Sequence, residues 1–176
     1  MDKITLKRIE TFHPDFRDKL RDDYLYCNNK LLGKGVRLRF SHVYRTNKEQ
    51  DDLFAIGRTK NGKIVTKAKG GQSIHNYALA FDIVLLYDND GNGTFEEASW
   101  SRVKDGDKDG VADWQEVVNY FKSKGYEHGG DWKHFKDYPH FQIKKEDGSS
   151  YNWKELKAKM DGGDYFIQDN IKYVNL

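Results

Sequence analysis

Two histidines and an aspartate in this chain have the side-chain types of a zinc site. His75 and Asp82 lie seven residues apart, and His140 follows the dipeptide Tyr138-Pro139. Imidazole nitrogens and carboxylate oxygens bind zinc, and three such ligands leave the fourth tetrahedral position open to water. A further carboxylate, Asp137, precedes the last histidine by three residues, where it could act as a general base. This combination is typical of a metallohydrolase.

The residues alone also allow an interpretation without a metal. Asp82 lies within the apolar run 80–87, where an unpaired carboxylate would be costly to desolvate. A cation beside Asp82 removes that cost, but an arginine or a helix end can do so too. Because His75 and Asp82 are an odd number of residues apart, one straight strand cannot direct both side chains to the same point. We therefore expect a bend between them, and we expect Pro139 to favour an extended chain that presents His140 at the start of a strand.

A second acidic segment follows the pattern of an EF-hand calcium loop. Gly110 would permit its sharp turn, and the upstream segment 88–99 begins in the same way but has Ser99 at the twelfth position, so we expect weak or no binding there. The candidate ligands of the second segment are Asp105, Asp107, Asp109, the carbonyl of Val111, Asp113 and Glu116.

Two interpretations of this second segment remain open. Asp113 and Glu116 could simply cap a helix and complement its dipole without any metal. Alternatively, a calcium ion could relieve the repulsion among the carboxylates, order the insertion near the cleft and make activity depend on calcium.

Composition limits the class of protein. The 176 residues fit one domain, and 30 basic against 28 acidic residues give a net charge of +2, which does not indicate a nucleic-acid partner. Cys27 is the single cysteine, so an intrachain disulfide and a four-cysteine metal site are excluded. We expect a monomer.

Hydropathy patterns indicate a protein without stable membrane insertion. The first residues, Met-Asp-Lys-Ile-Thr-Leu-Lys-Arg, lack the apolar stretch of a secretory signal, and no segment has the length needed to span a bilayer. We expect synthesis in the cytoplasm, so that any action outside the cell would need a separate exit route.

Periodicity and turn residues predict both helices and strands. Asn47 and Gln50 fit a capping box, Asp113 fits a helix cap, and Asp169-Asn170 fits a hairpin turn. Helices are predicted for 14–31, 47–57, 113–124 and from Asn152 onward. Strands are predicted for 36–43, 80–87 and 140–144, with a surface loop at 60–72 and an acidic insertion at 88–112.

Several motifs resemble those of one peptidase group, in the same order and at compatible spacing. Ser73-x-His75-x-x-Ala78-x-Ala80-x-Asp82 resembles the Ser-x-His-x-x-Gly-x-Ala-x-Asp signature of the zinc D-Ala-D-Ala peptidase and Hedgehog-like group. The segments 129–132 and 137–141 resemble the closing motif of its L-alanyl-D-glutamate endopeptidase branch, which includes many phage endolysins. Shorter matches lie at 44–46, 49–50, 57–59 and 112–114, so that the resemblance covers roughly residues 12–145.

The resemblance implies a role for each central residue. His75, Asp82 and His140 would bind zinc, Asp137 would be the catalytic base, and Arg45 would polarise the scissile carbonyl group. In this family glycine is common at the position of Ala78, and we expect the extra methyl group to affect local packing and not the ligands. His134 is the replacement ligand to consider if His140 is not one.

The fold implied by the resemblance is α+β, with a small, mostly antiparallel sheet that carries the zinc site and is flanked by helices, as in Hedgehog and D,D-peptidase domains. We expect residues 1–160 to form the catalytic domain, with the calcium-loop-like insertion at 88–116. Residues 161–176 would be a C-terminal extension that forms a hairpin.

The implied activity is hydrolysis of a peptidoglycan stem-peptide bond, L-alanyl-D-glutamate, by a cell-wall-lysing endolysin with zinc as cofactor. Such an endolysin would be made in the host cytoplasm without a signal peptide and would act on the cell wall after release. One alternative is a D,D-carboxypeptidase or dipeptidase that releases D-Ala. Another is a non-catalytic module that binds the wall or calcium. Asp137 and Arg45 argue against the binding module, because zinc binding requires neither residue.

Overall fold

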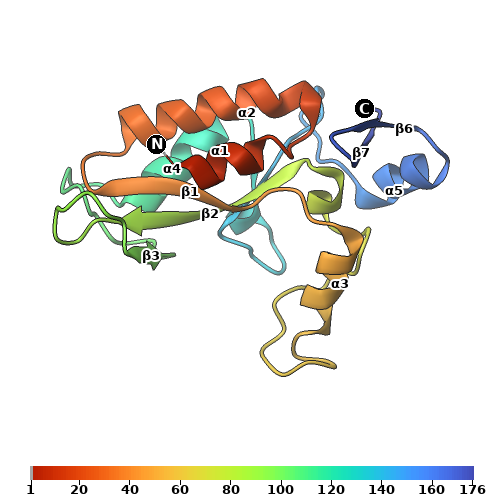
Figure 1. Cartoon of the computed structure of the whole chain (residues 1–176), viewed down its shortest axis with the longest axis horizontal. Helices are drawn as coiled ribbons and strands as arrows, with labels where there is room; N and C mark the ends of the chain where they lie inside the picture. The colour runs from red at the N-terminus through yellow and green to blue at the C-terminus, as the bar shows by residue number, and fades with distance from the viewer. Residues whose placement is uncertain (1) are drawn as a thin grey trace.

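The central sheet joins chain segments that lie far apart in the sequence (Figure 1). The computed structural model describes residues 2–176, and all strand pairs of the sheet are antiparallel. The α+β class predicted from the sequence is therefore confirmed. Neighbouring strands are, in order, β1 (Val36–His42), β2 (Ala80–Tyr87), β5 (His140–Gln142) and β4 (Glu127–His128), and β3 (Glu97–Ser99) also pairs with β2.

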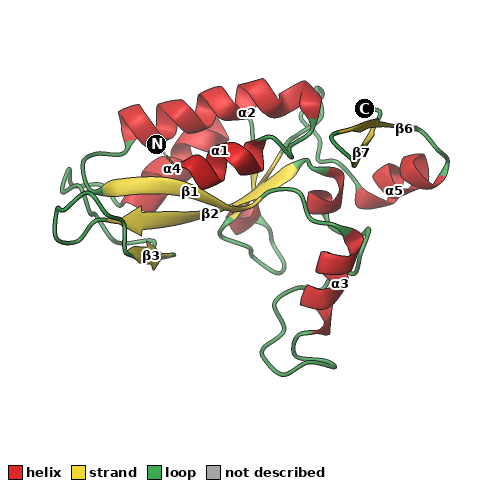
Figure 2. Ribbon diagram, in the orientation of Figure 1, coloured by secondary structure: helices red, strands yellow, loops and turns green. Residues whose placement is uncertain are grey.

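The helices cover the sheet and extend beyond it. Figure 2 shows α3 and the loop after it projecting from the body of the molecule, while α1 and α2 run along the sheet. Single turns of other helix types lie at Cys27–Leu31, Ile74–Tyr77 and Gly129–Asp131. The α-helices are α1 (Lys3–Ile9), α2 (Pro14–Tyr26), α3 (Asn47–Ala55), α4 (Asp113–Ser123) and α5 (Trp153–Asp161).

The main core forms where α2 and α4 meet the sheet. β1 alternates between buried and partly exposed residues, as expected for a strand with one covered face, whereas β2 is buried over almost its whole length. Phe40, Phe81, Phe121 and Phe141 are fully buried and stack or pack edge to face. Asp82 is thus a charged residue in a strand that the apolar core holds firmly in place.

Two predicted helix starts are wrong in detail. The capping box of α3 consists of Thr46 and Glu49 instead of Asn47 and Gln50, because the Thr46 side chain accepts from the Glu49 N–H and the Glu49 side chain accepts from the Thr46 N–H. Gln50 is instead fully buried. α4 has Ala112 as its N-cap, and Asp113 is its first residue.

The C-terminal segment forms a hairpin of β6 (Tyr165–Gln168) and β7 (Ile171–Val174). Asp169 and Asn170 both have positive φ, as the two central residues of a type I′ turn require. The hairpin packs on the start of α2, where His13 Nε2 lies 2.9 Å from the Val174 carbonyl oxygen. Within residues 2–176, no helix is long and apolar enough to cross a membrane.

Candidate metal centre

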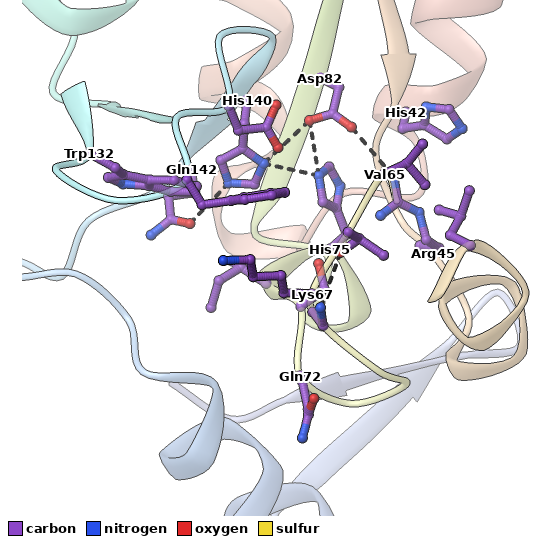
Figure 3. Close-up of a pocket in the computed structure, with 17 residues that line it drawn as sticks. His42, Arg45, Val65, Lys67, Gln72, His75, Asp82, Trp132, His140 and Gln142 are labelled. Atoms are coloured by element: carbon purple, nitrogen blue, oxygen red, sulfur yellow. Dashed lines mark hydrogen bonds and ion pairs between the residues drawn. The ribbon is translucent and has the colours of Figure 1, made fainter. Parts of the chain in front are cut away.

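Three potential ligand atoms meet at one end of the sheet (Figure 3). His75 Nε2 lies 3.1 Å from Asp82 Oδ1 and 3.2 Å from His140 Nδ1. Asp82 Oδ1 and His140 Nδ1 are 3.3 Å apart. A tetrahedral site with zinc–ligand bonds of ~2.0–2.1 Å separates its ligand atoms by ~3.3–3.4 Å. The group thus has the spacing of three corners of such a site and fits a metal ion.

Each ligand is placed by a different element. Asp82 of β2 and His140 of β5 are direct partners across the two strands. His75 lies in the helical turn before β2, and Ala78 at the end of that turn has φ of 58°. The left-handed backbone conformation of Ala78 makes the bend that the odd spacing requires. It also corrects the expectation for Ala78, because the preference for glycine there concerns the backbone conformation and not packing.

The second nitrogen of each histidine has a hydrogen-bond acceptor. His75 Nδ1 lies 2.7 Å from the Val43 carbonyl oxygen, and His140 Nε2 lies 3.0 Å from Gln142 Oε1. When a neutral imidazole donates to such an oxygen, the nitrogen that faces the other ligand atoms carries no proton, as a metal ligand must be. The two acceptors therefore favour the ring orientations and tautomers that metal binding needs.

A chain of hydrogen bonds extends outward from His140. Gln142 donates to Glu127 at 2.9 Å, and Glu127 also accepts from the Trp132 indole at 2.6 Å and from the Ser150 hydroxyl. Gln142 and Glu127 are not among the site residues predicted from the sequence. Gln142 could have been found, because two residues along a strand place it on the same side as His140.

The charges of the group support one another. Burial disfavours the charged form of Asp82, but the imidazoles of His75 and His140 outweigh it and hold the pKa of this carboxyl well below its usual range. Burial also opposes a charge on His140, yet hydrogen bonding to the Asp82 carboxylate raises the pKa of this imidazole overall. Asp82 is thus held as the anion, which is the form that binds a cation.

Arg45 lies beside the ligands. Its Nη1 donates to Gln50 Oε1 at 2.8 Å, and its Nη2 lies 3.4 Å from Asp82 Oδ2. Gln50 in turn donates to the Ala68 carbonyl oxygen at 2.8 Å, which ties the arginine to the loop after α3. The buried Gln50 explains how a short side-chain bridge holds Arg45 at the site, a role that the sequence analysis did not assign.

Asp137 lines the same cleft as the three ligands. Burial, followed by the negative charge of Asp82, raises the pKa of the Asp137 carboxyl. Its main chain is fixed by hydrogen bonds from its own N–H to the Gly129 carbonyl oxygen and from the His140 N–H to its own carbonyl oxygen. The main chain of Asp137 is thus fixed beside the cleft that its side chain lines.

The cleft has a volume of about 410 Å³ and runs between two loops. On one side are residues after α3, including the exposed Val65 and Lys67, and on the other are Trp132 and the half-exposed Phe135. The Lys67 ammonium lies 5.1 Å from the centre of the Phe135 ring, so the two walls approach each other. His75, Asp82 and His140, called the metal group below, form the floor of an open groove.

The other histidines stay outside the metal group. His128 is buried and its Nε2 lies 2.8 Å from the Tyr138 carbonyl oxygen, while His134 is exposed and does not line the cleft. His134 is therefore not a replacement ligand. His42 lies at the rim, and burial followed by the charge of Arg45 lowers the pKa of its imidazole.

The acidic segment 105–116 gathers its carboxylates as the loop pattern predicts. Burial and the charges of Asp109, Asp107 and neighbouring aspartates raise the pKa of Glu116 to about 7. In the upstream segment, the carboxylates at the first, third and ninth positions also meet. The groups whose ligand oxygens lie within 4.8 Å of one another are Asp105, Asp107 and Asp113; Asp107, Asp109 and Glu116; and Asp88, Asp90 and Glu96.

The two acidic loops lie at the end of β2 that is remote from Asp82 (Figure 1). The first loop directly follows Tyr87, and Asp113 of the second accepts from the Tyr87 hydroxyl. The expectation that the loops themselves lie near the cleft is therefore wrong. The segment between them does reach the other end, because the Arg102 guanidinium lies 3.9 Å from the centre of the Tyr138 ring. Tyr138 directly follows Asp137.

Comparison with known proteins adds sequence and fold relationships. Residues 66–143 match the model of a family described as D-alanyl-D-alanine carboxypeptidase, a branch of the M15 peptidases. The chain is 47% identical over 110 residues to the peptidoglycan L-alanyl-D-glutamate endopeptidase CwlK of Bacillus subtilis (strain 168). The match covers 62% of this chain and 62% of CwlK, so less than two thirds of that relative is spanned.

The fold is similar to that of a solved peptidase. The crystal structure of the Serratia marcescens L-Ala D-Glu endopeptidase ChiX superposes with a TM-score of 0.53 and covers 84% of this chain and 91% of ChiX. At 19% sequence identity, this likeness supports the fold alone.

Proposed function

We propose that the protein is a zinc-dependent peptidoglycan endopeptidase, because residues 66–143, which contain all three candidate ligands, match a model of the M15 family of peptidases. Its bond would be the one between L-alanine and D-glutamate in the stem peptide, as in the name of the Bacillus relative. The observation that carries the proposal is the set of three ligand atoms, 3.1 to 3.3 Å apart, in the floor of a groove that Asp137 and Arg45 also line.

The donor set fits zinc better than a harder cation. Two imidazoles and one carboxylate are typical of catalytic zinc, whereas magnesium and calcium prefer ligand sets made of oxygens. His75 Nε2, Asp82 Oδ1 and His140 Nδ1 would hold the ion. Bound zinc would act as a Lewis acid and bring the pKa of a water molecule close to neutral.

Asp137 would then transfer protons, and Arg45 would stabilise the developing negative charge. Asp137, with its raised pKa, would accept the proton of the attacking water and deliver it to the leaving amine. The Arg45 guanidinium, held by Gln50, would stabilise the negative charge that develops on the scissile carbonyl oxygen.

The groove offers chemistry that suits a short acidic peptide. Lys67 would pair with the free carboxylate of D-glutamate, while the exposed Val65 and Phe135 would contact the apolar part of the stem. Every group named here comes from a single chain, so the enzyme would act as a monomer on peptidoglycan.

A second candidate is a carboxypeptidase that removes terminal D-Ala. The description of the matching family model favours it. The same ligands and the same proton transfers would serve both reactions, so the position of the bond in the substrate distinguishes them.

Mass spectrometry of purified peptidoglycan digested with zinc-loaded protein tests the proposal. We expect new amino-terminal D-glutamate in the digest, absent with His75→Ala and retained with His134→Ala, a control at an exposed histidine outside the group. Release of D-Ala alone would establish the carboxypeptidase instead. No new termini with several wall types would reject both peptidase assignments.

A further inference from the structure

The acidic segment 105–116 has no part in the proposed hydrolysis, although its carboxylates converge. The two groups that share Asp107 represent the first, third, fifth, ninth and twelfth positions of the loop. Calcium binds oxygens at ~2.3–2.6 Å, so two of its ligands can lie up to ~5 Å apart. The limit of 4.8 Å within each group therefore agrees with oxygens that surround one calcium ion.

Asp113 provides an observation that is independent of the cluster. Its side chain is fully buried, and its Oδ2 accepts from the Tyr87 hydroxyl and from the Gly106 N–H, both at 2.8 Å. Its Oδ1 is also buried but has no hydrogen-bond partner within residues 2–176. A buried carboxylate oxygen without a donor is strongly unfavourable. Because the Asp113 carboxylate converges with those of Asp105 and Asp107, a cation at their centre would satisfy it.

Glu116, at the twelfth position of the loop, also has a buried carboxylate oxygen without a donor among residues 2–176. Its Oε2 is buried without a hydrogen-bond partner in the described part of the chain. Among the ion pairs formed by residues 2–176, none involves a carboxylate of the segment 105–116, and nearby Lys104 pairs with Glu97 instead. The protein thus supplies the negative charges of a site without its own counter-charge.

We propose that residues 105–116 bind one calcium ion that joins the insertion to the start of α4. An all-oxygen set rich in carboxylates suits Ca²⁺, whereas Mg²⁺ requires a smaller and more regular octahedron. The ligands would be the carboxylates of Asp105, Asp107, Asp109, Asp113 and Glu116, with the carbonyl oxygen of Val111.

The position of the site indicates what the ion would do. Asp107 also accepts from the Gly33 N–H at 2.7 Å, and Asp113 accepts from Tyr87 at the end of β2. α4 begins at Asp113 and carries the buried Phe121 of the main core. Calcium would therefore fix α4 against the sheet and raise the thermal stability of the whole domain, whether or not the protein is a peptidase.

Calorimetric titration of CaCl₂ into the zinc-loaded, calcium-depleted protein of residues 1–176 tests the proposal. We expect binding with a Kd between ~10⁻⁶ and 10⁻³ M and a higher melting temperature with calcium. Glu116→Gln should weaken this binding at least about tenfold and remove most of the melting shift. Glu155→Gln, the same change in the first turn of α5, should leave both unchanged.

Glu116→Gln removes repulsion and is expected to fold, and Asp109→Asn at an exposed ligand provides a second variant with the same expected loss. The proposal is overturned if calcium gives neither heat nor a melting shift in the unmodified protein. It is also overturned if both variants bind calcium as tightly as that protein, or if MgCl₂ at equal concentration gives equal shifts.

Discussion

The metal centre and the segment 105–116 both gather carboxylates but balance their charge differently. At the centre, Asp82 lies between two imidazoles with Arg45 close by, and each imidazole is held by a further hydrogen bond. In the loop, carboxylates converge and two buried oxygens have no hydrogen-bond partner among residues 2–176. At the metal centre, protein groups thus balance the charge of the carboxylate. In the loop, the charge of the carboxylates would be balanced only by a bound ion.

This difference has consequences for stability. Strands β2 and β5 position Asp82 and His140 through the sheet, so the centre is expected to keep its shape when zinc is removed. The loop instead contains electrostatic repulsion, so removal of calcium should lower the stability of the fold. Four experiments test this difference between the two sites.

The largest effect is expected for Asp137→Asn. An amide cannot accept the proton of the attacking water, so kcat should fall by about 10² to 10⁴-fold while zinc content stays unchanged. Asp131→Asn, a control at an exposed aspartate of the preceding turn, should retain activity. The readouts are hydrolysis of a stem peptide and zinc content by atomic absorption. Loss of zinc in Asp137→Asn would show that Asp137 helps to bind the metal, which contradicts its assignment as the base alone.

Gln142→Leu tests whether the protein itself orients the ligands. The change removes the acceptor for His140 Nε2 and the link to Glu127, so zinc affinity should fall by about 10 to 100-fold. Affinity can be measured by competition with a chromophoric chelator, with Gln168→Leu on the exposed side of β6 as control. Equal affinity of the two variants would mean that the outer hydrogen bonds do not prepare the site.

The acidic loop predicts a dependence of stability on pH in calcium-free protein. The folded state raises the pKa of Glu116 from 4.5 to about 7, so its protonated form stabilises the fold fully below pH 4.5. That contribution is lost as pH rises through about 7, and after allowance for solvent screening it amounts to about 1 kcal/mol. Thermal melts between pH 5 and 8 should therefore fall more steeply for the unmodified protein than for Glu116→Gln. Parallel curves would contradict this repulsion.

The smallest effect is expected for Arg102→Ala, in the segment that joins the two acidic loops and contacts Tyr138 beside Asp137. An exposed cation–π contact contributes about 0.5–1 kcal/mol, so loss of the contact with Tyr138 should lower kcat by about two- to fivefold. Arg37→Ala removes a matched contact with Phe95, at 3.8 Å, and should leave kcat unchanged. If Arg102→Ala also leaves kcat unchanged, the segment between the acidic loops does not influence the metal centre.

The sequence predicted best those features that depend on local patterns. The apolar run 80–87 matches β2 to the residue, and the spacing of His75 and Asp82 correctly required a bend. The helix starts were less certain because capping patterns overlap: a pair three residues apart fits both Thr46–Glu49 and Asn47–Gln50.

Contacts between distant segments could not be predicted in the same way. Glu127 supports His140 through Gln142 only because β4 pairs with β5, and Gln50 reaches Arg45 only because α3 turns it inward. Asp113 was expected to cap a helix, but the neighbouring Tyr87 and Gly106 draw its carboxylate inward. These roles follow from tertiary packing, which the pattern of single residues does not reveal.

The central claim is that His75, Asp82 and His140 hold the zinc ion on which hydrolysis depends. The most direct measurement combines zinc content with cleavage of a synthetic L-Ala–D-Glu stem peptide, before and after chelation and after zinc is restored. We expect one zinc ion per chain at this site and a folded but inactive protein after chelation. Activity should recover fully with zinc, and His75→Ala should show neither zinc nor cleavage. Cleavage by the zinc-free protein, or equal zinc binding and cleavage by His75→Ala, would contradict the central claim.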